Sequence, residues 1–283
     1  MLSKKLLNLE IDSLHDIRAF VEVYEEVAAT RMQRIRTDVM KARQFLEGLT
    51  AVFSDVKYNY QSQVGQIVAQ TKLSRNGRSV AVFISANSGL YGDIINQTFQ
   101  MFLGYLDTHP DTDAVVIGKQ GVRLIAESRP KILYNYFDFS DDRVDSESLG
   151  MMMRYLLQFE KIVVFYGKFK NIVEQIPEST SISGDEILEA ETGEKKHKKY
   201  LFEPSLAGIL QIFEGEILAS LFEQVLHESS LAKFASRLTH LDQAIENIDG
   251  KLGNLAVDAR ILRHKLDNKR QLARISGISI WEK

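Results

Sequence analysis

The chain has 283 residues, a formal net charge of -3 and a pI near 6.1, and 45% of its residues are hydrophobic. This balance gives no electrostatic case for nucleic-acid binding, and the absence of cysteine excludes disulfides and thiolate metal sites. No stretch approaches the roughly 18 uninterrupted apolar residues of a membrane span, so we expect any membrane contact to be made only through other subunits.

The first predicted element is a helix from Ile11 to about Asn59, capped by Asp12 or Ser13. Its apolar residues recur at alternating spacings of three and four, which is typical of a heptad seam. The seam residues are Leu14, Ile17, Val21, Tyr24, Ala28, Ile35, Ala42, Phe45, Leu49, Val52 and Val56. Arg31 and Asp38 interrupt the apolar seam.

After a polar linker that contains Asn76-Gly77, the spacing of the apolar residues no longer follows the helical repeat. Short β-branched apolar runs then alternate with helical stretches, which predicts a mostly parallel sheet with crossover helices, a Rossmann-like α/β domain. We expect strands at 79–85, 114–117, 131–137 and 161–166, and helices at 93–106, 122–127 and 146–159. An acidic and then basic stretch over 182–199 is interpreted as a mobile hairpin or loop.

The last predicted element is a helix from Pro204 to Lys283, with no proline inside it. Its apolar seam is Leu231, Phe234, Leu238, Leu241, Ile245, Ile248, Leu252, Leu255, Ala259, Leu262 and Leu266. One helix cannot bury so narrow a seam alone, so we expect the two terminal helices to wind around each other. The expected domains are 1–70, 71–203 and 204–283. Charges at the seam positions of Arg31 and Lys269 either reach out to solvent or face a third surface.

The glycine-containing loops give no catalytic or nucleotide signature. Residues 88–92 lie after a strand and before a helix, where a phosphate loop would lie, but they lack the G-x-G-x-x-G spacing. We expect the glycines there and at Gly118 and Gly121 to serve a tight turn and close helix packing. No histidine pattern indicates a metal, and no serine has a nucleophile-elbow context. The sequence therefore predicts no catalytic, metal or cofactor site, and no bound cofactor.

Short motifs in a fixed order carry a family resemblance. They are Ile11-x-Ser13 with 27–34 (VAATRMQR), 85–96 (SANSGLYGDIIN), 116–121 (VIGKQG), 202–205 (FEPS), 228–238 (ESSLAKFASRL), and Arg263 with Gly277. They are similar, in order, to I-x-S…M-V-A-A-S-K-M-R-R, S-D-R-G-L-C-G-x-x-N, V-I-G-x-K-G, Y-E-P-S, E-S-x-A-S-E-x-A-A-R-M and R-Q…G. These are motifs of the γ subunit of F-type ATP synthases, which this chain resembles over nearly its whole length.

The chain also departs from that family's pattern. The family's basic K-I-T-K in the first helix is here Ala19-Phe20-Val21-Glu22, its R-Q pair is Arg263-His264, and the acid of its I-T-x-E is Arg270. In the family these segments lie where the shaft passes through its catalytic collar. The chain therefore resembles a divergent member with altered contacts at that level.

The resemblance implies an antiparallel coiled coil with an α/β domain at its base. It implies a non-catalytic role, the central rotor shaft of the F1 complex, which couples rotation of the membrane c-ring to ATP synthesis or hydrolysis. The implied partners are the hexamer of α and β subunits, the ε subunit and the c-ring of a proton- or sodium-translocating complex. The implied location is the cytoplasmic face of a bacterial inner membrane, or the matrix or stroma face in an organelle, as a peripheral membrane protein. Expected contacts with the hexamer are Arg31, Met32, Arg34, Arg263, His264, Arg270, Ile278 and Trp281.

Two alternative functions remain open at the level of the sequence. The loss of basic residues at Ala19 and Glu22 also fits a structural adaptor of a specialised F1-like ATPase without the usual membrane ring. A small-molecule-binding or enzymatic α/β domain with a coiled-coil appendage is the other alternative, and a ligand bound at 88–92 would distinguish it.

Overall fold

The computed structural model describes residues 4–60, 76–182, 203 and 205–281. The chain divides into two compact bodies. The first combines the residues up to Ala28 with those from Leu238 onward, and we call it the helix-pair body. The second runs from Ala29 to Arg237 and is called the α/β body.

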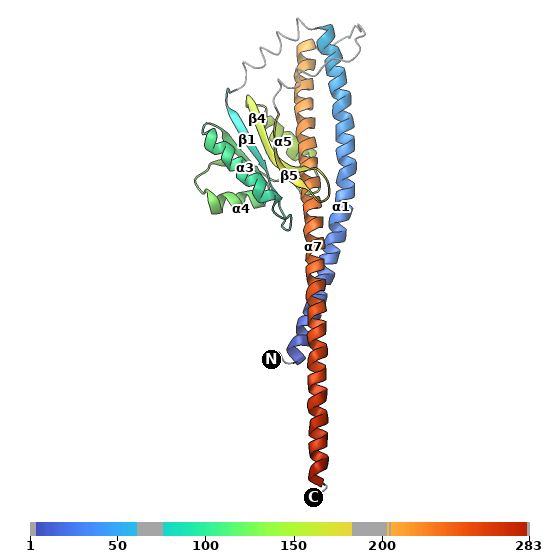
Figure 1. Ribbon diagram of the computed structural model, residues 1–283. Coiled ribbons are helices and arrows are strands. Elements are labelled where there is room, and N and C mark those ends of the chain that lie inside the picture. The colour runs from blue at the N-terminus through green and yellow to red at the C-terminus, as the bar shows by residue number, and fades with distance from the viewer. Residues whose placement is uncertain (1–3, 61–75, 183–202, 204, 282–283) are drawn as a thin grey trace. The chain divides into compact units, whose positions relative to one another are not determined.

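Two long helices, α1 (Lys4–Asn59) and α7 (Leu206–Trp281), begin and end the described chain (Figure 1). Proline, which removes a helical hydrogen bond and clashes with the preceding turn, occurs in neither helix. The predicted end of the first helix at Asn59 is confirmed. The predicted cap is wrong, because residues 4–10 are good helix formers and the helix already includes Asp12 and Ser13.

The helix-pair body contains an antiparallel pair, as the sequence predicts. Arg18 of α1 lies 2.7 Å from Asp249 of α7, whereas Leu7, eleven residues earlier in α1, lines a hollow with Leu262 and Leu266. On α7 the predicted seam from Leu241 to Leu262 matches the less exposed positions.

The predicted seam of α1 is partly wrong. Within the helix-pair body, the less exposed positions of α1 are Leu7, Ile11, Leu14, Arg18, Val21, Glu25 and Ala28. Ile17 and Tyr24 are 47% and 52% exposed. The less exposed positions follow Leu7 at alternating spacings of four and three residues, and this spacing places Arg18 and Glu25, rather than Ile17 and Tyr24, on the covered side of the helix. Within the α/β body the predicted seam residues Phe45 and Val52 are also exposed.

The α/β body contains one five-stranded sheet in the order β3-β2-β1-β4-β5. Its strands are β1 (Ser79–Ile84), β2 (Asp113–Ile117), β3 (Tyr134–Phe137), β4 (Lys161–Phe169) and β5 (Gln175–Ser181). The first four are parallel, as predicted, and β5 runs antiparallel to β4. Strand β3 begins at Tyr134 rather than Lys131, where its pairing with Ala114 of β2 begins.

Strand β5 was not predicted from the sequence. It is polar and contains Pro177, which cannot donate a hydrogen bond to a neighbouring strand. Such a strand is tolerated at the edge of a sheet, where β5 lies.

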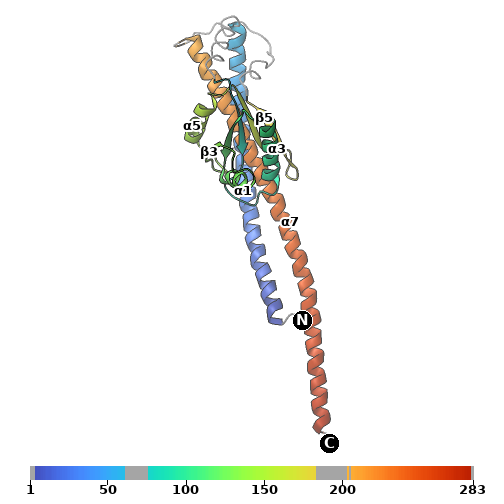
Figure 2. The same ribbon diagram turned by 90° about the vertical axis from the view of Figure 1, so that its left-hand side faces the viewer.

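Helices cover both faces of the sheet. On one face α3 (Ile94–Thr108) places Phe99 and Phe102 against Phe83 of β1, and α4 (Lys119–Ser128) packs through Gly121. The other face packs against α5 (Ser146–Leu156) and against Leu218 and Phe222 of α7. Figures 1 and 2 both show the sheet between α3 and α5. No helix in the described part of the chain has an apolar stretch long enough to cross a bilayer.

Candidate functional site

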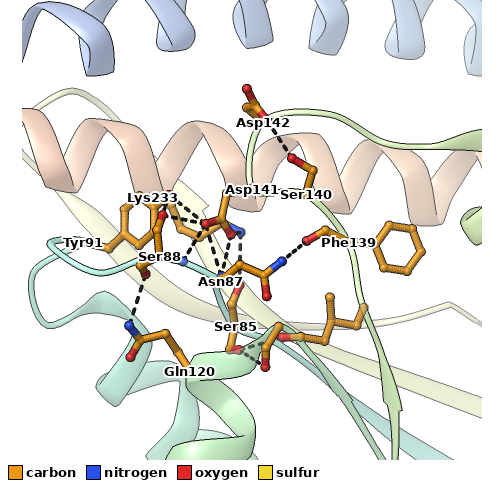
Figure 3. Close-up of polar contacts among 12 residues, drawn as sticks. Ser85, Asn87, Ser88, Tyr91, Gln120, Phe139, Ser140, Asp141, Asp142 and Lys233 are labelled. Carbon is orange, nitrogen blue, oxygen red and sulfur yellow. Dashed lines mark hydrogen bonds and ion pairs between the residues drawn. The ribbon is translucent and has the colours of Figure 1, made fainter. Parts of the chain in front are cut away.

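The loop after β1 surrounds the carboxylate of Asp141, which lies in the segment after β3 (Figure 3). The backbone N–H groups of Asn87 and Ser88 donate to this carboxylate at 2.9 Å each. The hydroxyl of Ser88 donates at 2.8 Å and that of Tyr91 at 3.0 Å. The edge of the sheet where a doubly wound fold commonly binds an anion therefore holds the chain's own carboxylate.

Helix α7 provides the cations of this site. The Nζ of the buried Lys233 donates to the carbonyl of Ser85 at 3.0 Å and lies 3.4 Å from Asp141. One turn later the guanidinium of Arg237 stacks on the ring of Tyr91, 3.9 Å from its centroid, and donates to Ser88 Oγ at 3.0 Å. We call Ser88, Tyr91, Asp141, Lys233 and Arg237 the Asp141 lock.

Burial and charge oppose each other within the lock. Burial disfavours ionisation of Asp141, but the Lys233 ammonium and the donors from Asn87 and Ser88 outweigh it, so the pKa of Asp141 is lowered. Burial lowers the pKa of Lys233, while Asp141 raises it. Burial and the neighbouring carboxylate raise the pKa of Tyr91, so its hydroxyl stays protonated and donates. The lock is therefore a buried ion pair in a shell of hydrogen-bond donors, with no nucleophile poised for chemistry.

The glycines around the lock have the conformational roles that the sequence predicts. Gly92 and Gly118 have φ values of 61° and 90°, where a side chain is strained. A Cβ at Gly118 would lie 2.8 Å from the backbone of Ala86, and one at Gly121 would lie 2.6 Å from Val116 Cγ1. The tight turn and the close packing of α4 on the sheet are confirmed. Within the described residues no group of His, Cys, Asp or Glu is arranged to hold a metal ion.

Acid should weaken the lock through Asp141. Because the folded pKa is lowered, the carboxylate stabilises the fold fully above its ordinary pKa of about 3.9 and loses that effect as the pH falls through the folded value. The amide oxygen of asparagine can still accept hydrogen bonds from the surrounding donors, so we expect Asp141→Asn to cost less than full loss of a partner, about 1–3 kcal/mol of unfolding free energy at pH 7, and less below pH 4. Urea unfolding at several pH values measures this, with the exposed Asp111→Asn as control. A pH-independent cost would contradict it.

The predicted hexamer-contact residues belong to both bodies. In the α/β body, Arg31 lies 3.8 Å from Asp142 and 5.8 Å from the ring centroid of Phe234, while Met32 is half-buried and Arg34 is exposed. Arg31 thus packs within its own body.

The helix-pair body contains the remaining predicted contact residues. Arg263 and Arg270 line a small hollow with Asp267, which lies 3.6 Å from Arg270, and His264 is exposed. The side chains of Ile278 and Trp281 lie outside the described residues.

Sequence reasoning missed Asp141, Lys233 and Arg237 as a unit. One signal was available at position 233, where the motif E-S-x-A-S-E-x-A-A-R-M has glutamate and this chain has lysine. A reversed charge within a family motif calls for a partner of opposite sign. Nothing in the sequence indicates that the partner is Asp141, because that residue lies in a connecting segment without a periodic pattern.

Comparisons with known proteins agree with one another. The family model described as ATP synthase matches residues 3–265. The ATP synthase gamma chain of Pelagibacter ubique is 23% identical over 96% of this chain and 97% of its own. That of Cytophaga hutchinsonii is 24% identical over 98% of each.

Solved structures give the same fold. A chain from the central stalk and c-ring of Tetrahymena thermophila mitochondrial ATP synthase superimposes with a TM-score of 0.59. It is 15% identical and covers 80% of this chain and 99% of its own length. A chain of Euglena gracilis mitochondrial ATP synthase superimposes with a TM-score of 0.52 at 12% identity over 94% of each.

Proposed function

Because this chain belongs to the γ-subunit family of ATP synthases, we propose that its α/β body is the base of the rotor and its helix pair the shaft. Its role is that of the central rotor shaft in the F1 part of an F-type ATP synthase. The observation that carries the assignment is the match of both chain and fold over nearly the whole length, from α1 through the five-stranded sheet to α7.

A shaft can transmit torque only if the α/β domain does not rotate relative to the shaft helix. The Asp141 lock connects α7 to the loops of the sheet and so opposes such rotation. Lys233 and Arg237 belong to α7, whereas Asp141, Ser88 and Tyr91 belong to loops of the sheet. Earlier along α7, the side chains of Leu218, Phe222 and Val225 pack into the apolar core of the sheet. We infer that torque entering the α/β body passes to α7 through these contacts.

Several finer assignments belong to this proposal. The α and β subunits form the hexamer that the shaft contacts, through Arg31, Met32, Arg34, Arg263, His264, Arg270, Ile278 and Trp281. The c-ring and the ε subunit contact the α/β body, on the cytoplasmic, matrix or stroma face of the coupling membrane. The functional segments are 1–70, 71–203 and 204–283.

One observation favours a second candidate, an adaptor or shaft in an F1-like ATPase without the membrane ring. Where the family has a basic K-I-T-K, this chain has Ala19-Phe20-Val21-Glu22, and the side chain of Phe20 is 69% exposed. Exposed Ala19 and Glu22 stand where that motif has its two lysines, so a surrounding collar would meet an acidic rather than a basic surface at this level.

Affinity purification of the full chain from its native cells in mild detergent, followed by an ATPase assay, distinguishes these functions. We expect the catalytic subunits and a membrane ring to co-purify in an active complex, with untagged cells as control. Catalytic subunits without a ring would instead support the adaptor. Elution of the chain alone or with unrelated partners would contradict both.

A further inference from the structure

The α/β body contains a cavity of about 310 Å³ between α1, the β4–β5 pair and α7. Three elements line it: α1 through Leu46 and Thr50, the β4–β5 pair through Tyr166 and Thr180, and α7 through residues 217–228. Its volume lies at the lower end of the range for small-molecule sites. None of its lining residues belongs to the Asp141 lock.

The lining combines an apolar wall with a few polar groups. The apolar side chains are Leu46, Ile182, Ile217, Leu221 and Val225. Among the described residues, the side chains of Gln224 and Glu228 have no hydrogen-bond or ion-pair partner, whereas the hydroxyls of Tyr166 and Thr180 lie 3.3 Å apart. Apolar walls with a few convergent polar groups are typical of sites that orient a small ligand.

Glu228 is the charged group of this cavity. It is half-buried, and burial raises the pKa of its carboxyl group. Arg43 of α1 and Lys168 of β4 oppose this shift and Glu178 of β5 adds to it, but Lys168 and Glu178 are already paired at 3.6 Å. A partly desolvated carboxylate without a direct partner gains most from a cation that brings its own apolar body.

We propose that this cavity binds a small organic cation with an apolar body, and that Glu228 is its counter-ion. The apolar body lies against Ile217, Leu221 and Val225, and Gln224 accepts a hydrogen bond from the ammonium head. The ligand contacts α1, the sheet and α7 at once, so its binding stabilises the α/β body. This inference is independent of the rotor function.

Three probes of similar shape test whether the cavity prefers a positively charged ligand. They are the cation 3-phenylpropylammonium, the neutral 3-phenylpropan-1-ol and the anion 3-phenylpropanoate. Calorimetry on the full-length chain at pH 7.5 measures their binding, and thermal unfolding measures stabilisation. We expect saturable binding and a raised Tm with the cation, and at least about tenfold weaker binding with the other two. Equal binding of all three, or no saturable binding of the cation, overturns the proposal.

Matched variants place the cation at Glu228. Glu228→Gln keeps the shape and removes the charge, and we expect it to weaken the cation about tenfold or more. Glu216→Gln, an exposed carboxylate on the same helix that does not line the cavity, should leave binding unchanged. Thr50→Phe should fill the space and abolish binding, with circular dichroism confirming that each variant is folded. An unchanged affinity in Glu228→Gln or in folded Thr50→Phe overturns the site.

The pH dependence gives an independent readout. Because protonation of Glu228 removes the counter-ion, cation binding should weaken as the pH falls through the raised pKa of Glu228, whereas binding to Glu228→Gln should not change over the same range. An identical pH profile in the two proteins would contradict the role of Glu228.

Discussion

Lys233→Glu is expected to destabilise the α/β body severely, although glutamate is the residue of the family motif at this position. Lys233 is buried against Asp141 at 3.4 Å, so the substitution removes one partner of a buried ion pair and places two carboxylates together. Removing one partner of such a pair costs about 3–5 kcal/mol, and the like charge adds to this cost. In urea unfolding we expect a lower midpoint than in wild type, or no cooperative transition at all.

Companion variants separate charge from packing. Lys251→Glu makes the same change at an exposed position of α7 and should have little effect. Lys233→Met should cost less than Lys233→Glu, and the double variant Lys233→Met with Asp141→Asn should recover part of that loss, because no unpaired charge remains. If Lys233→Glu were as stable as Lys251→Glu, the buried pair would not be important for stability.

Gly121→Ala is expected to be the second most harmful change. A Cβ there would lie 2.6 Å from Val116 Cγ1 and 2.7 Å from Ser85 Oγ, and the N–H of Gly121 donates to that same hydroxyl at 2.8 Å. Overpacking between α4 and a sheet buried on both faces, together with a strained hydrogen bond, should cost about 2–4 kcal/mol.

Gly104 of α3 provides the matched control for this substitution. A Cβ at Gly104 meets no atom within 4 Å, so Gly104→Ala should stabilise the chain by about 0.5–1 kcal/mol through helix propensity. Chemical denaturation measures both variants. Equal effects of the two alanines would contradict the close approach of α4 to the sheet.

The elements with strong local signals were predictable from the sequence. The run SVAVFI is apolar on both sides of the strand, and β1 lies buried at the centre of the sheet. The edge strand β5 could not be recognised from the sequence, because its polar residues and Pro177 do not form the apolar β-branched pattern of a buried strand. An edge strand tolerates such residues because it pairs on one side only. Ile17 was placed in the seam because it is apolar, whereas Arg18 occupies that position through its pairing with Asp249.

The Asp141 lock depends on contacts that are distant in sequence. Lys233 and Asp141 are 92 residues apart, and neither belongs to a pattern that relates it to the other. The sequence can show that position 233 departs from a family motif, but only the fold shows that Asp141 is the ion-pair partner of the lysine found there. The cavity beside Glu228 is similarly invisible, because it is a space between three elements rather than a run of residues.

The pairing of Arg18 with Asp249 joins residues that are 231 positions apart in the chain. At a synthesis rate of about 5–20 residues per second, the first helix waits on the order of 10–50 s before its partner has been made. Until then the residues of the first helix that face this part of α7 have no partner helix. Production of this protein should therefore depend on chaperones that shield a nascent amphipathic helix until translation ends.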